Sequence, residues 1–225
     1  MSKFAEIGDA LKAVLGGRLS NILDVSLPPL FFLFGDWLCC TDLGLQLALL
    51  ASVFVALVRL WRQEAVWAAL GGLGLAGFAG LLALWQANSQ AYFLPGMLSG
   101  IITVFLCLLS LVLRRPLVAW TSYLARRWPL AWHWHPRVRP AYAEVTAGWA
   151  LVFGLRSALQ YQFFASGQSS ALALSQVALG WPLILVLLVA SYAYGQWRLR
   201  RLAGPSIAEF EAGKQPPWEG QQRGF

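Results

Sequence analysis

The amino-acid sequence predicts an all-α protein: a polytopic membrane helix bundle with six transmembrane helices and both termini in the cytoplasm. Three observations support this fold class. Hydrophobic residues make up 58% of the 225 residues and charged residues 12%, with a mean hydropathy of +0.59, a balance typical of integral membrane proteins. Several apolar runs are long enough to cross a bilayer. Basic residues gather in alternate connections between these runs.

The segment before the first apolar run, residues 1–18, predicts an amphipathic helix in the cytoplasmic membrane interface. Phe4, Ile7, Leu11 and Leu15 recur at helical spacing, which gives the helix one apolar face. The segment is too short and too charged to span, so we expect it to lie along the membrane surface.

Six apolar runs follow within a transmembrane domain that covers residues 19–203. We predict the spans at residues 22–40, 43–60, 67–85, 93–113, 145–165 and 174–197. The first span contains Pro28 and Pro29, so we expect its helix to kink or break there. Spans three and four carry glycines in series, at residues 71, 72, 74, 77, 80, 96 and 100, which we interpret as close packing of helices or as a sliding interface.

Residues 204–225 predict a flexible cytoplasmic tail because Pro, Gly, Gln and Glu dominate this segment and few apolar residues are present to build a core.

The distribution of Lys and Arg predicts the topology. Sixteen of the 17 basic residues lie before the first span, after the sixth, or in the connections that follow spans two and four. Cytoplasmic loops carry such an excess, so these segments are predicted to face the cytoplasm. They include a basic face that we expect to contact anionic lipids: Arg59, Arg62, Arg114, Arg115, Arg126 and Arg127.

The remaining basic residue, Arg156, lies about 17 Å into span five, and Asp36 lies at a similar depth of about 21 Å in span one. A charge at this depth is costly unless it is paired. We therefore predict an intramembrane cluster in which Arg156 pairs with Asp36, assisted by Gln160 one turn further along. Such a pair either locks two helices together or serves a substrate or a proton. Asp24, an acid at the inner interface, is expected to meet a basic neighbour: Arg18, Arg59 or Arg62.

Motifs for catalysis or for cofactor binding are absent from the sequence, so we expect a protein that is not an enzyme and that binds no metal, cofactor or nucleic acid. His133 and His135 offer two imidazoles where a zinc site needs three or four ligands. We expect these histidines to reach lipid headgroups from the membrane interface. The three cysteines predict free thiols, since their spacing suggests neither a disulfide nor a metal site: Cys39, Cys40 and Cys107.

Six segments between residues 15 and 200 carry a family resemblance: LGGRLSNILDVSLPPLFFLF, VRLWRQEAVWAALGGLGLAG, YFLPGMLSG, LLSLVLRRPLV, GWALVFGLRSALQYQFF and LGWPLILVLL. Their most specific elements are FLPG at residues 93–96, RRPL at residues 114–117, and the pattern Trp149, Phe153, Arg156, Gln160. These segments resemble the DUF3159 family of bacterial membrane proteins. More distantly, the order of elements is similar to intracellular septation protein A. The resemblance implies a multi-pass protein of the bacterial inner membrane.

Two functions follow as expectations. The first is a non-catalytic role in cell-envelope maintenance or membrane scaffolding, with the bilayer, other membrane proteins or a second copy as partners. The alternative is a transporter or channel-like protein for a small molecule or an ion, which would use Arg156 and Asp36. Polar groups that continue beyond Arg156 would favour the transporter, whereas a structural clasp needs a single partner for Arg156.

Overall fold

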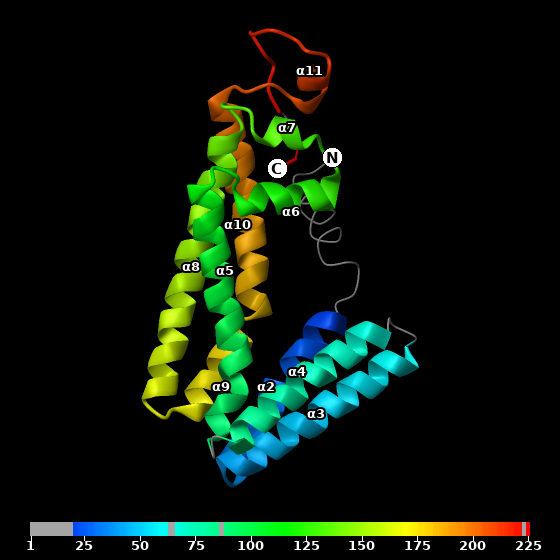
Figure 1. The fold of residues 1–225 in the computed structure, drawn as a ribbon, viewed down its shortest axis with the longest axis vertical. Coiled ribbons are helices and arrows are strands. Elements are labelled where there is room, and N and C mark those ends of the chain that lie inside the picture. Colours follow the sequence, from blue (N-terminus) through cyan, green and yellow to red (C-terminus); the bar gives the residue numbers. More distant parts are fainter. Residues whose placement is uncertain (1–19, 63–65, 86–87, 222–223) are drawn as a thin grey trace. The chain divides into compact units, whose positions relative to one another are not determined.

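The computed structural model describes residues 20–62, 66–85, 88–221 and 224–225. These residues form helices and no strand (Figure 1), which confirms the all-α class. The amphipathic helix predicted at residues 1–18 lies outside the described residues. The helices are α2 (Ser20–Leu38), α3 (Thr41–Trp61), α4 (Val66–Trp85), η1 (Ser89–Phe93), α5 (Leu94–Val112), α6 (Leu117–Arg126), α7 (Leu130–His133), α8 (Arg139–Ala165), α9 (Ser169–Ala178), α10 (Trp181–Leu202) and α11 (Ile207–Glu211).

The chain divides into two compact units. Among the described residues, unit 1 comprises Ile101–Gly154 and Leu185–Phe225, and unit 2 comprises residues 20–100 and Leu155–Ile184. Helices α5, α8 and α10 therefore contribute residues to both units.

Three helical stretches in the described residues are long and apolar enough to cross a membrane. They are Thr41–Trp61, Gln90–Val112 and Ser169–Leu202, and a shorter apolar helix covers Leu73–Trp85. These stretches indicate a membrane protein. The six-span topology and the cytoplasmic placement of both termini stay predictions.

Helix α2 runs without interruption through Pro28 and Pro29, so it does not break there, and the alternative of a kink stays a prediction. A proline ring has a helical φ and costs a helix mainly one backbone hydrogen bond, and the apolar neighbours of α2 keep it helical. Its buried Phe32 packs edge-on against Phe93, with ring centroids 4.8 Å apart.

A sharp turn leads from α2 into α3, and the two helices pack closely at a pair of glycines. A Cβ atom added to Gly35 would lie 2.6 Å from the Cα atom of Gly44, and one added to Gly44 would lie 2.6 Å from the carbonyl oxygen of Phe32. Backbone therefore rests on backbone at this point. At Gly71, Gly74 and Gly77 of α4, by contrast, a Cβ would meet no described atom within 4 Å, so close packing does not explain those glycines.

The predicted sixth span is divided into two helices. Helix α9 ends at Ala178, and α10 begins at Trp181. Gly180 and Pro182 flank the start of α10, and proline cannot donate a backbone hydrogen bond to continue α9. A Cβ at Gly180 would lie 2.5 Å from the carbonyl oxygen of Gln176, so this tight connection requires glycine.

Unit 1 has an aromatic core to which the connection between α6 and α8 contributes through α7. Trp132, His133 and Tyr142 are all fully buried, and the indole of Trp132 donates a 2.8 Å hydrogen bond to the carbonyl oxygen of Pro205. The expectation that the histidines reach lipid headgroups is thus wrong for His133, because α7 turns its ring into this core. Burial lowers the pKa of His133 below its usual value.

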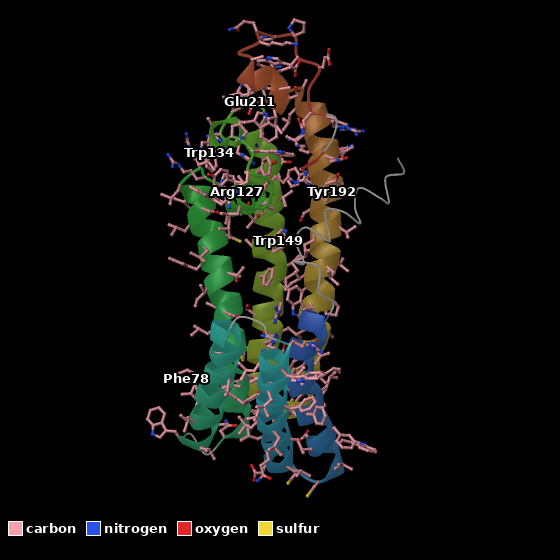
Figure 2. All side chains as sticks on the ribbon, turned by 90° about the vertical axis from the view of Figure 1, so that its right-hand side faces the viewer. Phe78, Arg127, Trp134, Trp149, Tyr192 and Glu211 are labelled. Carbon is pink, nitrogen blue, oxygen red and sulfur yellow. The ribbon has the colours of Figure 1, made fainter. Side chains whose placement is uncertain are left out.

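Helices α8 and α10 are joined in unit 1 by polar contacts at two levels. The indole of Trp149 donates to Ser191 Oγ at 2.8 Å, and Figure 2 labels Trp149 among the side chains of α8. Nearer the ends of the helices, Glu144 accepts two hydrogen bonds from Arg198, at 2.7 and 2.6 Å. The Arg198 guanidinium, with Tyr194, holds the pKa of the Glu144 carboxyl below its usual value.

The described residues after α10 contact one another around Glu209 and contact α8 through Phe225. Ser206 and Glu209 form a capping box at the start of α11, and the Glu209 carboxylate also accepts hydrogen bonds from the backbone N–H groups of Glu219 and Gly220, at 2.8 and 3.3 Å. The backbone N–H of Glu219, followed by Ser206, lowers the pKa of Glu209 to about 2. Phe225 stacks on Tyr142, with ring centroids 4.4 Å apart. The described part of the tail thus makes specific contacts, and its predicted flexibility stays a prediction.

Candidate functional site

A group of polar side chains lies among the helices of unit 2. Arg156, Ser157 and Gln160 follow one another on α8, and Gln176 lies on α9. The guanidinium of Arg156 donates a 3.3 Å hydrogen bond from Nη2 to Oε1 of Gln176. Gln160, four residues after Arg156 and so on the same face of α8, is fully buried. We call these four residues the polar cluster.

Several atoms of the polar cluster are buried and have no hydrogen-bond partner among the described residues. They are Nε2 and Oε1 of Gln160, Oγ of Ser157 and Nε2 of Gln176. Buried polar side-chain atoms in proteins nearly always have a partner, either protein or water. Four such atoms on neighbouring side chains are therefore unusual, and water or another molecule can supply their partners.

Two glycines of α5 make room for the polar cluster. A Cβ at Gly96 would lie 2.9 Å from Nε2 of Gln176, and a Cβ at Gly100 would lie 2.9 Å from Oγ of Ser157. Both distances are shorter than real Cβ contacts allow. These glycines were predicted to bring helix backbones together, but the structure places polar side chains against them.

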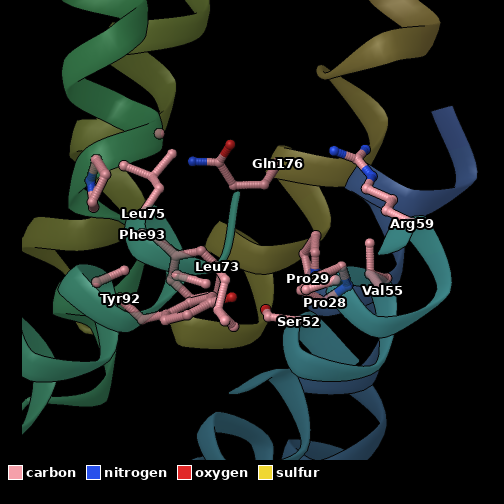
Figure 3. Close-up of a pocket in the computed structure, with 15 residues that line it drawn as sticks. Pro28, Pro29, Ser52, Val55, Arg59, Leu73, Leu75, Tyr92, Phe93 and Gln176 are labelled. Carbon is pink, nitrogen blue, oxygen red and sulfur yellow. The ribbon is translucent and has the colours of Figure 1, made fainter. Parts of the chain in front are cut away.

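A cavity of about 280 Å³ adjoins the polar cluster at Gln176 (Figure 3). Its wall is mostly apolar and is built from α2, α3, α4, η1, α5 and α9. Pro28, Pro29, Val55, Leu73, Leu75 and Phe93 give it apolar surface, and the polar side chains of Ser52, Arg59, Tyr92 and Gln176 reach it. An apolar chamber with a few polar groups at its wall is the usual form of a small-molecule site.

The Asp36 carboxylate has other partners than the predicted Arg156. Oδ1 accepts a 2.9 Å hydrogen bond from the hydroxyl of Thr41, the first residue of α3, and Oδ2 accepts one from Ser170 in the first turn of α9. The structure thus brings Asp36 to the N-terminal ends of two helices, where the helix dipoles favour a negative charge. Arg156 and Asp36 are not brought together as a hydrogen-bonded pair among the described residues.

The other predicted site residues are spread over both units. Asp24 lies in α2, but its side chain is not among those that the structure describes. In the predicted basic face, Arg59 and Arg62 belong to unit 2 and the other four arginines to unit 1. Arg115 lies 5.7 Å from the ring centroid of Trp134, and Arg126 lies 4.7 Å from that of Trp128.

Several residues of the site escaped the sequence analysis. Gln176 is one polar amide in the apolar run LALSQVALG, which was a usable signal because buried polar residues in a span are costly. The cavity wall at Pro28 and Tyr92 had no such signal. It depends on which faces of separate helices meet, and a linear pattern does not contain that information.

The family model "Protein of unknown function (DUF3159)" matches residues 15–201. The chain belongs to the DUF3159 family. The match confirms the predicted family, whereas the more distant similarity to intracellular septation protein A is not shown. Curated proteins and solved structures give no match.

The matched part of this DUF3159 chain includes the whole polar cluster and every residue of the cavity wall. Two of the specific elements quoted above lie at the site. Residues 93–96 line the cavity through Phe93, Pro95 and Gly96, and the pattern on α8 supplies Arg156 and Gln160. Among the described residues, no group of three His, Cys, Asp or Glu side chains is close enough to hold a metal ion.

Proposed function

We propose that this DUF3159 protein binds a small molecule in unit 2 and carries it across the bacterial inner membrane, as a multi-pass transporter that changes no covalent bond. The observation that carries the proposal is a cavity whose wall includes Gln176, one of three neighbouring side chains, with Ser157 and Gln160, whose buried polar atoms lack a partner among the described residues.

Buried polar atoms without hydrogen bonds destabilise the folded protein. Each buried polar group without a hydrogen bond costs about 1–3 kcal/mol. Leucine could replace glutamine at residues 160 and 176 with little change in volume and without that cost. Proteins keep such destabilising groups mainly where function uses them. Binding of a molecule that supplies the missing hydrogen bonds would repay the cost.

The polar atoms also extend beyond the contact between Arg156 and Gln176. A clasp between two helices needs those two side chains alone. Ser157 and Gln160 add hydrogen-bonding capacity that the clasp does not use, and Gln176 connects the polar cluster to the cavity. This arrangement favours a site over a purely structural contact.

A non-catalytic role in envelope maintenance or scaffolding is the second candidate. It is supported by arginines that lie over aromatic rings in unit 1, such as Arg201, which is 4.3 Å from the ring centroid of Trp197. Arginine beside tryptophan suits the headgroup region of a membrane, and anionic lipids, other membrane proteins or a second copy would be its partners.

The proposal is tested with three probes that share a phenyl ring: phenylacetate, 2-phenylethanol and 2-phenylethylammonium. We expect at least one of them to bind the purified protein in detergent, seen by calorimetry and as a raised Tm. Ala76→Phe, which places a ring at the cavity wall, should abolish binding. Gly77→Phe is the matched control, because Gly77 does not line the cavity and a Cβ atom added there would meet no described atom within 4 Å.

Uptake tests the transport step. The probe that binds is offered to proteoliposomes, and we expect uptake by the wild type and none by Gln176→Leu. If none of the three probes binds, or if the bound probe is not taken up, the proposed transporter is contradicted.

A further inference from the structure

We propose that the exposed face of α6, in unit 1, lies in the headgroup region of a membrane leaflet that contains acidic phospholipids, and that arginines at the two ends of α6 bind the lipid phosphates. This inference goes beyond the proposed function. It concerns a surface of unit 1 and does not depend on the cavity in unit 2.

The exposed face of α6 has no charged side chain. The exposed residues of this helix are Trp120, Thr121, Leu124 and Ala125, and residues three and four apart share one face. Leu124 is 63% exposed. A helix on a water-facing surface usually has charged side chains on its exposed side, so the composition of this face indicates an apolar neighbour.

The neighbouring helix places α6 at the edge of a membrane. Helix α5 belongs to the stretch Gln90–Val112, which is long and apolar enough to cross a bilayer, and Val112 at its end is 79% exposed. Helix α6 begins at Leu117 and runs across the direction of α5 (Figure 1). If α5 crosses the bilayer, α6 therefore lies along the membrane surface, as amphipathic interfacial helices do.

Arginine and tryptophan side chains meet beside this face. The Arg115 guanidinium lies 5.7 Å from the ring centroid of Trp134, and that centroid lies 5.9 Å from the ring centroid of Trp120. Tryptophan is enriched in the headgroup region of membranes, and a guanidinium forms paired hydrogen bonds with phosphate oxygens. Arg115 at the start of α6 and Arg127 at its end are both exposed, so both are available to lipid phosphates.

The backbone at the two ends of α6 points to the same surface. Arg114 and Arg127 have positive φ values of 57° and 59°. Glycine adopts this left-handed conformation with less strain than any residue that has a Cβ atom. An arginine at each place therefore destabilises the turn relative to glycine, and a contact made by its side chain would offset that cost.

The charge around α6 favours acidic lipid over a second copy of this chain. Residues 114–139, which include α6 and α7, carry six arginines and no acidic residue. An acidic leaflet attracts each basic side chain near its surface. In a symmetric dimer formed through this face, by contrast, the same arginines of the two copies would meet and repel one another.

The position of α6 is measured with a fluorophore at residue 124. The variant Leu124→Cys also carries Cys39→Ser and Cys40→Ser, and the buried Cys107 should stay unlabelled. It is labelled with a nitrobenzoxadiazole thiol reagent and reconstituted into vesicles of phosphatidylethanolamine and phosphatidylglycerol. We expect lipids with a nitroxide near the top of the acyl chain to quench the emission at least about twofold, because the face lies at that depth.

The matched control is Ala212→Cys, which is exposed at the end of α11. Its fluorophore should be quenched by iodide in the buffer and not by the nitroxide lipids. Quenching of residue 124 by iodide alone would place α6 in water. Quenching by neither reagent would show that protein covers this face. Either result would overturn the inference.

The preference for acidic lipid is measured as the Tm in detergent after addition of phosphatidylglycerol or phosphatidylcholine. We expect phosphatidylglycerol to raise the Tm more. Arg127→Gln should reduce the difference between the two lipids by about half, and Arg115→Gln combined with Arg127→Gln should abolish it. Each variant is compared with its own lipid-free Tm, which separates lipid binding from any loss of basal stability.

Lys214→Gln is the matched control for charge, because it removes one positive charge from an exposed residue of unit 1 outside residues 114–139. It should keep the full difference between the lipids. Equal effects of the two lipids on the wild type, or an undiminished difference in the double variant, would contradict binding of acidic lipid at α6. None of these results bears on binding in the cavity of unit 2.

Discussion

Single residues decide how two half-buried charges of opposite sign, Asp36 and Arg156, are held. The Asp36 carboxylate accepts hydrogen bonds from the hydroxyls of Thr41 and Ser170, in the first turns of α3 and α9. The Arg156 guanidinium donates one to Gln176. Counting residues along each predicted span gives similar depths for Asp36 and Arg156, which made a direct pair a reasonable prediction. Which face of each helix carries the charge, and which neighbour it meets, depends on the packing of several helices, and the sequence alone does not specify that packing.

These contacts predict that Asp36 and Arg156 act independently on stability. In a double-mutant cycle of Asp36→Asn and Arg156→Gln, measured by denaturation in detergent, we expect a coupling energy below about 0.5 kcal/mol. A parallel cycle of Arg156→Gln and Gln176→Leu should show a larger coupling, of about 0.5–3 kcal/mol. Strong coupling in the first cycle would instead show that Asp36 and Arg156 interact directly.

His133 predicts a loss of stability in acid. Burial lowers its pKa below the value of about 6.5 that it has in the unfolded chain. The neutral ring is therefore favoured by folding, and its stabilising contribution is complete above pH 6.5 and lost as the pH falls through 6.5 towards the folded pKa. The free energy of unfolding should fall by at most about 1.4 kcal/mol per pH unit from this group.

The measurement for His133 is the Tm between pH 7.5 and 5. His133→Gln should remove most of the acid sensitivity in this interval. Burial and the charge of Arg137 lower the pKa of His135 as well, but its ring is only half-buried, so His135→Gln should keep most of the acid sensitivity. An unchanged acid sensitivity in His133→Gln would show that another group is responsible.

At the scale of elements, the close contact of Gly35 and Gly44 between α2 and α3 predicts that one added methyl group lowers the stability of the protein strongly. Gly44→Ala would bring its Cβ within 2.6 Å of a backbone oxygen, which cannot move aside without separating the helices. We expect destabilisation of about 2 kcal/mol or more.

Gly77→Ala on α4 is the control for this effect, because its Cβ meets no described atom within 4 Å. Alanine favours a helix over glycine by about 0.8–1 kcal/mol, so this variant should be as stable as wild type or more so. Denaturation curves of both variants in one detergent make the comparison. Equal Tm values for Gly44→Ala and wild type would contradict the close contact.

The positions of the helices were largely predictable from the sequence, because an apolar run of the right length is enough to predict one. The predictions 43–60 and 93–113 correspond to α3 at Thr41–Trp61 and α5 at Leu94–Val112. The interruptions were less predictable. Pro28 and Pro29 lie inside a continuous helix, while Gly180 and Pro182 separate α9 from α10. A proline disfavours a helix by a few kcal/mol, and contacts with neighbouring helices decide whether the helix continues.

The candidate site was predictable in part, for the same reason. Arg156 and Gln160 stand out because they are polar within an apolar run. The roles of Gly96 and Gly100 required the identity of the side chains packed on them, Gln176 and Ser157, which come from helices distant in sequence. Spacing indicated that these glycines lie at contacts but not what they contact.

At the scale of the whole molecule, the predicted topology can be tested with the native cysteines. Cys39 and Cys40 are exposed between α2 and α3, and Cys107 is buried. If both termini are cytoplasmic and residues 22–40 span the membrane, a membrane-impermeant maleimide should label Cys39 and Cys40 in intact cells from outside.

The control for this labelling is Lys214→Cys in a variant whose three native cysteines are replaced by serine. Residue 214 belongs to the predicted cytoplasmic tail, so it should react only after the membrane is permeabilised. Labelling of Lys214→Cys in intact cells, with protection of Cys39 and Cys40, would reverse the predicted orientation.

The two attachments of the tail bear on how the protein responds to a protease. Lys214 is exposed, and it lies between α11, which is secured by Glu209, and Phe225, whose ring fills the space that Gly195 leaves on α10. Brief trypsin treatment that cuts after Lys214 should therefore leave the short fragment bound. Size-exclusion chromatography would show one unchanged peak, and the fragment would separate only under denaturing conditions. Gly195→Leu, which occupies the space of the ring, should release it during chromatography.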